Sequence, residues 1–263
     1  MLKALKIMSI SLQNELEYRF NYFISIIGSF IPFIVNLLVW YAIDKNYNNN
    51  MGYTFSQIVN YYFWILIIGN VLNSTNNTAD LIRTGEINSY LIKPFNYTLY
   101  SFLIDLPKRL FFIIVAILLI IVSQVWLSEY ITINMSFGIC LAFVFSLAIG
   151  YVMNFLLIFI LNEFAFSLTQ ISLFMGAYNV LLNVTSGKLM PLDMFPKALR
   201  KVLEILPFQY CGYFQTKIVT NSFDDIKDIL TKFLFGIIWL LLLSMFSTFY
   251  WKQSVKKYSA YGG

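Results

Sequence analysis

Long stretches without a charged residue constrain this 263-residue sequence most. The hydrocarbon core of a bilayer is about 30 Å thick, so a helix needs about 20 apolar residues to cross it. Suitable stretches predict six spans, at 22–43, 55–72, 110–127, 135–161, 164–185 and 233–251. Because a lipid-exposed backbone must satisfy its own hydrogen bonds, these spans are expected to be helices. The predicted fold is all-α, a polytopic membrane protein with residues 1–263 in a single transmembrane domain.

The composition supports a membrane protein and excludes several kinds of enzyme. Hydrophobic residues make up 59% of the chain and charged residues only 12%, whereas soluble domains carry about 25% charged residues. The absence of histidine excludes a Ser-His-Asp triad and histidine metal sites. Cys140 and Cys211 are too few for a zinc site or a disulfide framework. The sequence also lacks a G-x-x-x-x-G-K-[ST] phosphate loop, so it is not expected to bind ATP in that manner or to be an enzyme.

The distribution of lysine and arginine predicts the orientation of the spans. With the N-terminus inside, the short outer loops hold only Lys45. The inner segments then hold Lys3, Lys6, Arg19, Arg83, Lys93, Lys108, Arg109, Lys252, Lys256 and Lys257. Since basic residues favour the cytoplasmic side, both termini are expected in the cytoplasm. The long segment 186–232 carries both signs of charge, and long loops obey the rule less strictly. The net charge of +5 is explained in this way rather than by nucleic acid as a partner.

Residues 1–20 are predicted to form an amphipathic helix that lies on the membrane surface. Its apolar face would be formed by Leu2, Leu5, Met8, Leu12, Leu16 and Phe20. Charges such as Lys3, Lys6 and Glu15, and the lack of a small-residue cleavage site, exclude a signal peptide. The alternative is an ordinary cytoplasmic extension of the first span.

The segment 78–94, between the second and third spans, is predicted to be a short helix-turn-helix at the cytoplasmic edge of the membrane. Gly85 can adopt a positive φ and end the first helix. Thr84 or Asn88 could cap the second helix, and Pro94 stops it. The apolar residues that need a partner surface are Leu81, Ile82, Ile87, Leu91 and Ile92. The alternative is a well-capped loop that rests on its own helical bundle.

The long outer segment 186–232 contains a short apolar hairpin bounded by glycine and proline. Pro196 suits the first turn of a helix and Pro207 is expected to end it, so this helix is too short to cross a bilayer. Such a hairpin is typical of a re-entrant element, and the alternative is a helix that lies flat on the outer leaflet. Further on, Ser222 and Asp225 resemble a capping box, which predicts another short helix leading into the last span.

Polar and charged residues near the spans are interpreted as structural. Glu163 is expected to mark a cytoplasmic turn, and a functional intramembrane carboxylate is the alternative. Asp105, Lys108 and Arg109 look like the cap and the interface anchors of the third span, with Pro107 in its first turn. The asparagines within spans are expected mainly to bond neighbouring helices. They are Asn36, Asn60, Asn70, Asn154 and Asn179.

The order of these features resembles a known family of membrane proteins. Residues 82–94, Ile-Arg-Thr-Gly-Glu-Ile-Asn-Ser-Tyr-Leu-Ile-Lys-Pro, are similar to the R-x-G-x-[ILV]…L-[ILV]-x-P signature of one branch of small bacterial ABC permeases. The run Ser-Gly-Lys-Leu-Met-Pro at 186–191 is followed by Phe-Pro at 195–196 and Leu-Pro-Phe at 206–208. Together with the N-terminal helix and six spans, these motifs resemble the permeases of the type 2 ABC-exporter superfamily over nearly the whole chain.

The resemblance implies a transmembrane permease subunit, most simply of an exporter in the bacterial cytoplasmic membrane, with no cofactor in this chain. ATP and Mg would be bound by a partner, an ABC ATP-binding subunit, and a second permease chain, identical or related, would complete the path among the membrane lipids. The segment 78–94 would couple to the ATPase through Arg83, Gly85, Glu86, Leu91, Lys93 and Pro94. An outer re-entrant gate would be formed by Gly187, Pro191, Pro196, Pro207 and Phe208. No motif identifies the substrate.

Two other classes of protein stay open at this point. One is a non-transport scaffold or sensor that uses the same bundle to bind a partner. The other is an ion-coupled carrier, which should show intramembrane charges or discontinuous helices near the midplane. The sequence has almost no such charges, which disfavours the carrier. Copurification with an ATP-binding subunit would separate a permease from a scaffold.

Overall fold

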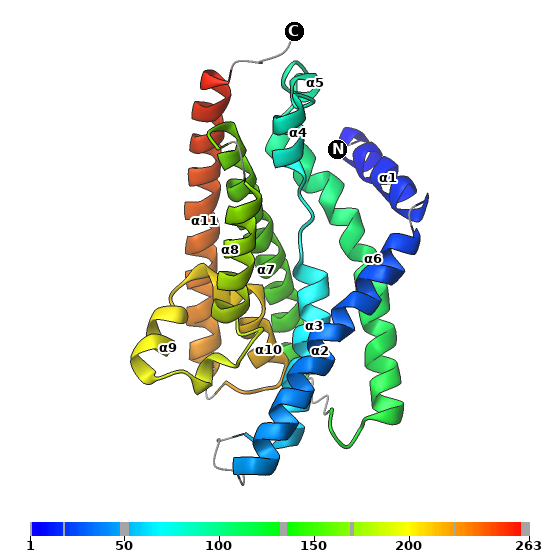
Figure 1. Cartoon of the computed structure of the whole chain (residues 1–263), viewed down its shortest axis with the longest axis vertical. Coiled ribbons are helices and arrows are strands. Elements are labelled where there is room, and N and C mark those ends of the chain that lie inside the picture. Colours follow the sequence, from blue (N-terminus) through cyan, green and yellow to red (C-terminus); the bar gives the residue numbers. More distant parts are fainter. Residues whose placement is uncertain are drawn as a thin grey trace.

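The computed structural model describes residues 2–17, 19–47, 53–131, 136–168, 171–223 and 225–258. All regular secondary structure in this described part is helical, as predicted (Figure 1). Its α-helices are α1 (Leu2–Glu17), α2 (Arg19–Tyr47), α3 (Phe55–Leu72), α4 (Thr78–Thr84), α5 (Asn88–Leu91), α6 (Tyr97–Trp126), α7 (Phe137–Glu163), α8 (Ser172–Thr185), α9 (Lys197–Leu203), α10 (Tyr213–Val219) and α11 (Ile226–Lys257). Its 3₁₀ helices are η1 (Phe164–Phe166), η2 (Leu192–Met194) and η3 (Pro207–Cys211).

Five of the described helices are long and apolar enough to cross a membrane. These segments are Phe23–Asn46, Phe55–Leu72, Tyr97–Trp126, Phe137–Phe166 and Ile226–Lys256. The span predicted at 164–185 is not confirmed, because η1 and α8 divide it. With 14 residues, α8 is about 21 Å long, which is shorter than the hydrocarbon core of about 30 Å.

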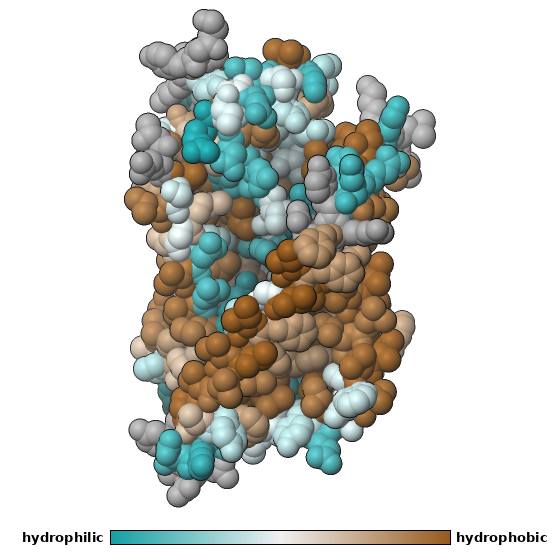
Figure 2. All heavy atoms as spheres, turned by 45° about the vertical axis from the view of Figure 1, so that its right-hand side comes forward, coloured by the Kyte–Doolittle hydropathy of each residue, from teal (hydrophilic) through white to brown (hydrophobic). Residues whose placement is uncertain are grey.

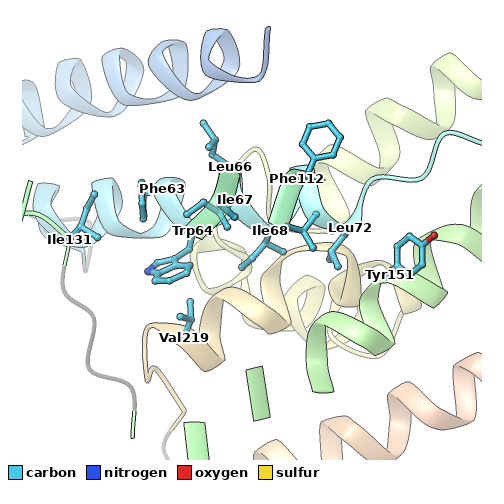
Figure 3. Packing of buried hydrophobic residues seen from close by; sticks show 12 residues of the cluster. Phe63, Trp64, Leu66, Ile67, Ile68, Leu72, Phe112, Ile131, Tyr151 and Val219 are labelled. Atoms are coloured by element: carbon cyan, nitrogen blue, oxygen red, sulfur yellow. The ribbon is translucent and has the colours of Figure 1, made fainter. Parts of the chain in front are cut away.

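The buried centre of the molecule is formed by α3 and α7. α3 packs against α2, α6 and α10, and α7 packs against α10 and α11. In the apolar stretch of α3, 72% of the residues are buried, whereas in those of α2 and α11 only 6% are. Figure 3 shows fully buried Trp64 of α3 beside Val219 of α10. α2 and α11 therefore turn most of their apolar surface outward, toward lipid or another protein.

The two ends of the molecule differ in what they carry. α1, the α4–α5 pair and the last turns of α11 lie at one end, and the 127–131 turn lies at the opposite end (Figure 1). Between the ends, hydrophobic residues form a broad band (Figure 2). α1 and the end of α11 thus lie at the same end of the molecule, and the expected cytoplasmic position of both termini stays a prediction.

The N-terminal helix is present where the sequence predicts it. The Ser11 hydroxyl donates to the backbone oxygen of Ile104 at 2.7 Å, and Glu15 pairs with Lys108 at 3.4 Å, so α1 packs against α6. On its other side Leu5 and Leu16 are 56% and 63% exposed. The exposed apolar face favours contact with a membrane surface, which stays a prediction.

The third span begins earlier than predicted. α6 starts at Tyr97, so Pro107 lies inside the helix instead of in its first turn. Asp105 and Arg109 are buried and are neither a cap nor interface anchors. The prediction was wrong because it placed the start of the span after the last charge, and here two charges pair with each other inside the helix.

The last span is also longer than predicted. The Asp225 carboxylate accepts a hydrogen bond from the Lys227 N–H at 3.3 Å and caps α11. The helix then continues without a break to Lys257, so the prediction of a separate short helix before this span is wrong. The predicted capping box had Ser222 as the cap, whereas Asp225 caps the helix, and no proline follows it to end the first turns.

Candidate coupling segment, outer segment and groove

The segment 78–94 folds as two short helices with a glycine between them. α4 ends at Thr84, and Gly85 has a φ of 79°, a left-handed conformation that glycine adopts without steric cost. The predicted break at Gly85 is therefore confirmed. Neither Thr84 nor Asn88 caps the second helix, because the Thr84 hydroxyl bonds back to its own helix and Ile87 occupies the cap position of α5.

One side of this segment is tied to the helical bundle. Ile87 is fully buried and packs in a cluster with Phe155 and Phe159 of α7. The backbone N–H of Ala79 donates to the side-chain oxygen of Asn162 at 3.0 Å. Displacing α4 and α5 would therefore disturb α7, one of the two central helices.

The other side of the segment is exposed. The side chain of Arg83 is 72% exposed, and Ile92 is 84% exposed. Of the other residues predicted to couple, Glu86, Lys93 and Pro94 are exposed, Leu91 is half-buried and Gly85 forms the turn. Ile92 was not among them, yet it is the most exposed large hydrophobic residue that the structure describes. Like Leu91, it was expected to need a partner surface, but nothing in the local sequence favoured Ile92 over Leu91 as the docking residue.

A β-branched residue at Gly85 is expected to strain this turn. The side chain of Gly85→Val would meet open space, so any loss of stability comes from the backbone and amounts to about 1–2 kcal/mol. Gly85→Asn is the control, because asparagine tolerates the left-handed region better than valine. Thermal unfolding of the purified variants measures the difference, and an equal loss in both would contradict the argument.

A buried ion pair lies where the chain leaves α3 toward α4. Arg109 Nη2 is 3.3 Å from Asp105 Oδ1, and the two side chains are 5% and 3% exposed. The Asp105 carboxylate also accepts hydrogen bonds from the Thr75 N–H and the Tyr151 hydroxyl, each at 3.0 Å. Because buried charges are stable only when paired and hydrogen-bonded, this cluster joins the end of α3 to α6 and α7.

Glu163, the last residue of α7, lies at the turn into η1, as predicted. Its side chain is nevertheless fully buried, and the Ser247 hydroxyl of α11 donates to its Oε1 at 2.9 Å. Glu163 therefore links α7 to α11.

The outer segment is held by two tyrosines of α3. The Tyr61 hydroxyl donates to the backbone oxygen of Gly187 at 2.7 Å, and the Tyr62 hydroxyl donates to that of Leu189 at 2.6 Å. Gly187 has a φ of 78°, and a Cβ there would lie 2.6 Å from the Tyr61 hydroxyl. Both its backbone conformation and the close approach of Tyr61 require glycine at this position.

The prolines of the outer segment bound short helices, with one difference from the prediction. Pro191 precedes η2, and Pro196 directly precedes α9. Pro207 does not end α9, which already stops at Leu203, and instead opens η3. Phe208 is half-buried against α8. None of these helices is long enough to span a membrane, and a re-entrant course for them stays a prediction.

A chain of ion pairs ties α9 to the start of α11. Arg200 pairs with Asp193 at 2.6 Å and with Glu204 at 2.7 Å, and Lys232 pairs with Glu204 at 3.0 Å. Burial by itself raises the pKa of Glu204, but the hydrogen bonds from Arg200 and Lys232 outweigh burial and bring the pKa below its ordinary value. The Glu204 carboxylate is thus stabilised in its charged form.

A groove of about 480 Å³ lies between α2, α3 and α8. Its amide and ammonium side chains are those of Asn36, Asn70, Asn73, Asn179, Asn183 and Lys188. For Asn36, Asn70 and Asn179 the expected bonds to neighbouring helices are absent: Asn70 bonds within α3, and the other two side chains make no hydrogen bond to a described residue. For Asn154 the expectation is confirmed, since its side chain donates to the backbone oxygen of Leu72 at 2.7 Å.

These features define a multi-pass helical membrane protein with an anchored helix-turn-helix at one end and a polar groove within its apolar band. The family model described as "ABC-2 family transporter protein" matches residues 30–262, so the chain belongs to that family. It is therefore a membrane permease component of an ABC transporter rather than a catalytic subunit, and membership implies partnership with an ABC ATP-binding subunit. No curated protein matches the chain.

Proposed function

We propose that the chain is one of two permease subunits of an exporter in the bacterial cytoplasmic membrane. Separate ABC subunits would dock on α4 and α5, bind ATP and Mg, and hydrolyse the ATP. This end of the molecule and both termini would then lie in the cytoplasm. One observation carries the proposal: the segment is anchored through Ile87 and exposes Arg83, Glu86 and Ile92 on its other side. Ile92 and Phe95, directly after the segment, are 84% and 39% exposed. Arg83, Glu86 and Lys93 are exposed as well. An apolar centre with a charged rim is the arrangement expected of a docking surface.

Two connections would carry the movement of a docked ATPase into the membrane. Ile87 packs against α7, and residues 73–77 join α4 to α3 and are held by Asp105 through Thr75. Displacing α4 is therefore expected to shift α3 and α7 together as rigid bodies. The ion pairs around Arg200 would hold the proposed outer gate against α11 while this happens.

The second permease chain would cover part of the outward-facing surface. Only 6% of the residues in the apolar stretch of α2 are buried, and this helix also carries the groove residues Asn36 and Ser29. Polar residues on a spanning helix favour contact with another helix or a water-filled path over contact with lipid. We therefore place the second chain along the edge of α2 beside the groove, so that the groove itself stays open to lipid.

Replacing Glu86 with arginine and Ile92 with aspartate is expected to prevent capture of the ATP-binding subunit. In Glu86→Arg/Ile92→Asp the anchoring residues are untouched, and loss of a central docking contact should reduce the copurified ATPase at least about tenfold. The measurement is affinity purification of the permease after coexpression with the ATP-binding subunit.

The control for this experiment carries the same chemical changes at the opposite end of the molecule. Leu127 and Glu129 are exposed in the 127–131 turn, so Leu127→Asp/Glu129→Arg should retain the ATPase at the wild-type level. Equal retention by the two double variants would leave the segment 78–94 as a simple connector and would refute the proposal.

A further inference from the structure

The groove between α2, α3 and α8 combines a polar interior with an apolar wall. Figure 2 shows hydrophilic residues that reach into the hydrophobic band. Asn36 comes from α2, while Asn179 and Asn183 lie four positions apart on α8 and so share one face of that helix. The wall between them is built by apolar side chains, among them Phe33, Ile65, Leu66 and Leu182.

Four asparagine side chains of the groove lack partners within the described chain. Asn36, Asn73, Asn179 and Asn183 make no side-chain hydrogen bond to any described residue. A polar group at the depth of the bilayer is costly unless it is hydrogen-bonded. Asn73, Asn179 and Asn183 are exposed and Asn36 is half-buried, so water or a polar ligand in the groove can reach their amides.

Lys188 adds a positive charge to the same groove. Its ammonium forms no hydrogen bond or ion pair with a described residue, and its Cε lies 4.0 Å from where a Cβ on Gly69 would be, so the side chain extends along α3. Loss of surrounding water lowers the pKa of Lys188 below the ordinary value for lysine. Lys201 also lacks an ion-pair partner among the described residues, but it is exposed. Lys188 is half-buried, and no described carboxylate pairs with it, so the groove holds a positive charge without a counter-ion among the described residues.

We propose that the groove binds the anionic headgroup of an amphiphile, a phosphate or carboxylate, with Lys188 as its counter-ion. The asparagines would donate to the headgroup oxygens, and the apolar wall would hold the first methylenes of the tail. A volume of about 480 Å³ accommodates these parts and leaves the rest of the tail in lipid. Val35, which lines the groove and is 52% exposed, marks its open side toward the membrane.

The inference rests on the proposed function for one point only, namely that the bound amphiphile is the transported substrate. The same chemistry is present in ordinary anionic phospholipids of the bilayer. A phospholipid that simply occupies the groove would stay there during ATP hydrolysis, whereas a substrate would leave.

The binding experiment uses the full chain in phosphatidylcholine nanodiscs and a fluorescent phosphatidic acid as the probe. Lys188→Gln should weaken binding at least about tenfold, the loss expected for a charge-assisted hydrogen bond, and Lys188→Arg should stay close to wild type. Lys201→Gln, which makes the same charge change at an exposed lysine of the outer segment, is the control and should change affinity less than about twofold. Unlabelled phosphatidic acid should displace the probe, and unlabelled phosphatidylcholine should not.

A second variant keeps the test valid if Lys188→Gln does not fold. Gly69→Leu keeps every charge and places a side chain beside Lys188, where the structure offers room, so it should also weaken binding at least about tenfold. Wild-type affinity in both variants, a loss in Gly69→Leu without one in Lys188→Gln, or equal losses in Lys188→Gln and Lys201→Gln would each overturn the proposal.

The second arm adds the ATP-binding subunit and ATP. Release of the probe during hydrolysis supports a transported substrate, and retention of the probe overturns that part of the inference and identifies a bound lipid. If Lys188-dependent binding holds but no ATP-binding subunit is captured, the proposed function fails and the binding site stands. If the subunit is captured but binding is independent of Lys188, only the present inference fails.

Discussion

Replacing Arg109 with methionine is expected to destabilise the folded protein by about 3–5 kcal/mol. The change leaves the Asp105 carboxylate, 3% exposed in its side chain, without its counter-charge. Its remaining partners, Thr75 and Tyr151, donate neutral hydrogen bonds that cannot replace a cation. Because this cluster joins α3 to α6 and α7, the same change should uncouple ATP hydrolysis from transport even where the protein still folds.

The control for Arg109→Met is its neighbour. Lys108 pairs with Glu15 through side chains that are 20% and 21% exposed, and its ammonium also donates to Thr75 Oγ1 at 3.3 Å. Because Glu15 keeps contact with water, Lys108→Met should cost about 1–2 kcal/mol, less than Arg109→Met. The double variant Asp105→Asn/Arg109→Met removes both charges and should regain much of the loss. Denaturant unfolding in detergent compares the stability of the three variants. Similar losses for Arg109→Met and Lys108→Met would contradict a special role of the buried ion pair in joining α3 to α6 and α7.

The second large effect is expected at Gly150 in the middle of α7. A Cβ there would collide with the Gln215 side chain and the backbone oxygen of Tyr210, and would lie 2.9 Å from Leu72 Cδ1. Gly150→Ala should therefore force η3 and α10 away from α7, at a cost of about 3 kcal/mol, the upper part of the range for overpacking.

The matched variant for Gly150→Ala is Gly176→Ala in α8. A Cβ at Gly176 meets no atom within 4 Å, and alanine favours a helix, so stability should stay the same or rise by about 0.5–1 kcal/mol. Thermal unfolding and limited proteolysis of the outer segment measure both variants. Equal melting temperatures for them would show that the outer segment does not depend on close packing at Gly150.

Apolar runs predicted most of the spanning helices because lipid tolerates few other structures, and this constraint acts on local sequence. The run at 164–185 met the same criterion, yet the chain turns at η1 and forms only the short α8. Asp105 and Arg109 escaped prediction for a related reason, since they are four residues apart on one helix and neutralise each other in its interior. Only the hydrogen bonds from Thr75 and Tyr151, which come from other parts of the chain, distinguish such a buried pair from interface anchors.

In the candidate sites too, some features follow from the local sequence and others depend on the packing of separate helices. The break at Gly85 could be predicted because a positive φ is a local demand that glycine meets. The exposure of Ile92 and the position of Lys188 beside Gly69 depend on how separate helices pack. A lysine in a Gly/Pro-bounded loop gives no local sign that it will extend into a groove between three helices.

Photo-crosslinking from Ile92 in intact membranes tests the central claim, coupling to an ATP-binding subunit through the segment 78–94, most directly. A benzophenone amino acid at Ile92 should give an adduct with the ATP-binding subunit on irradiation. The same amino acid at Leu127, exposed at the opposite end, should give none. An adduct from Leu127 equal to that from Ile92, or no adduct from Ile92 in membranes that contain the subunit, would contradict the account.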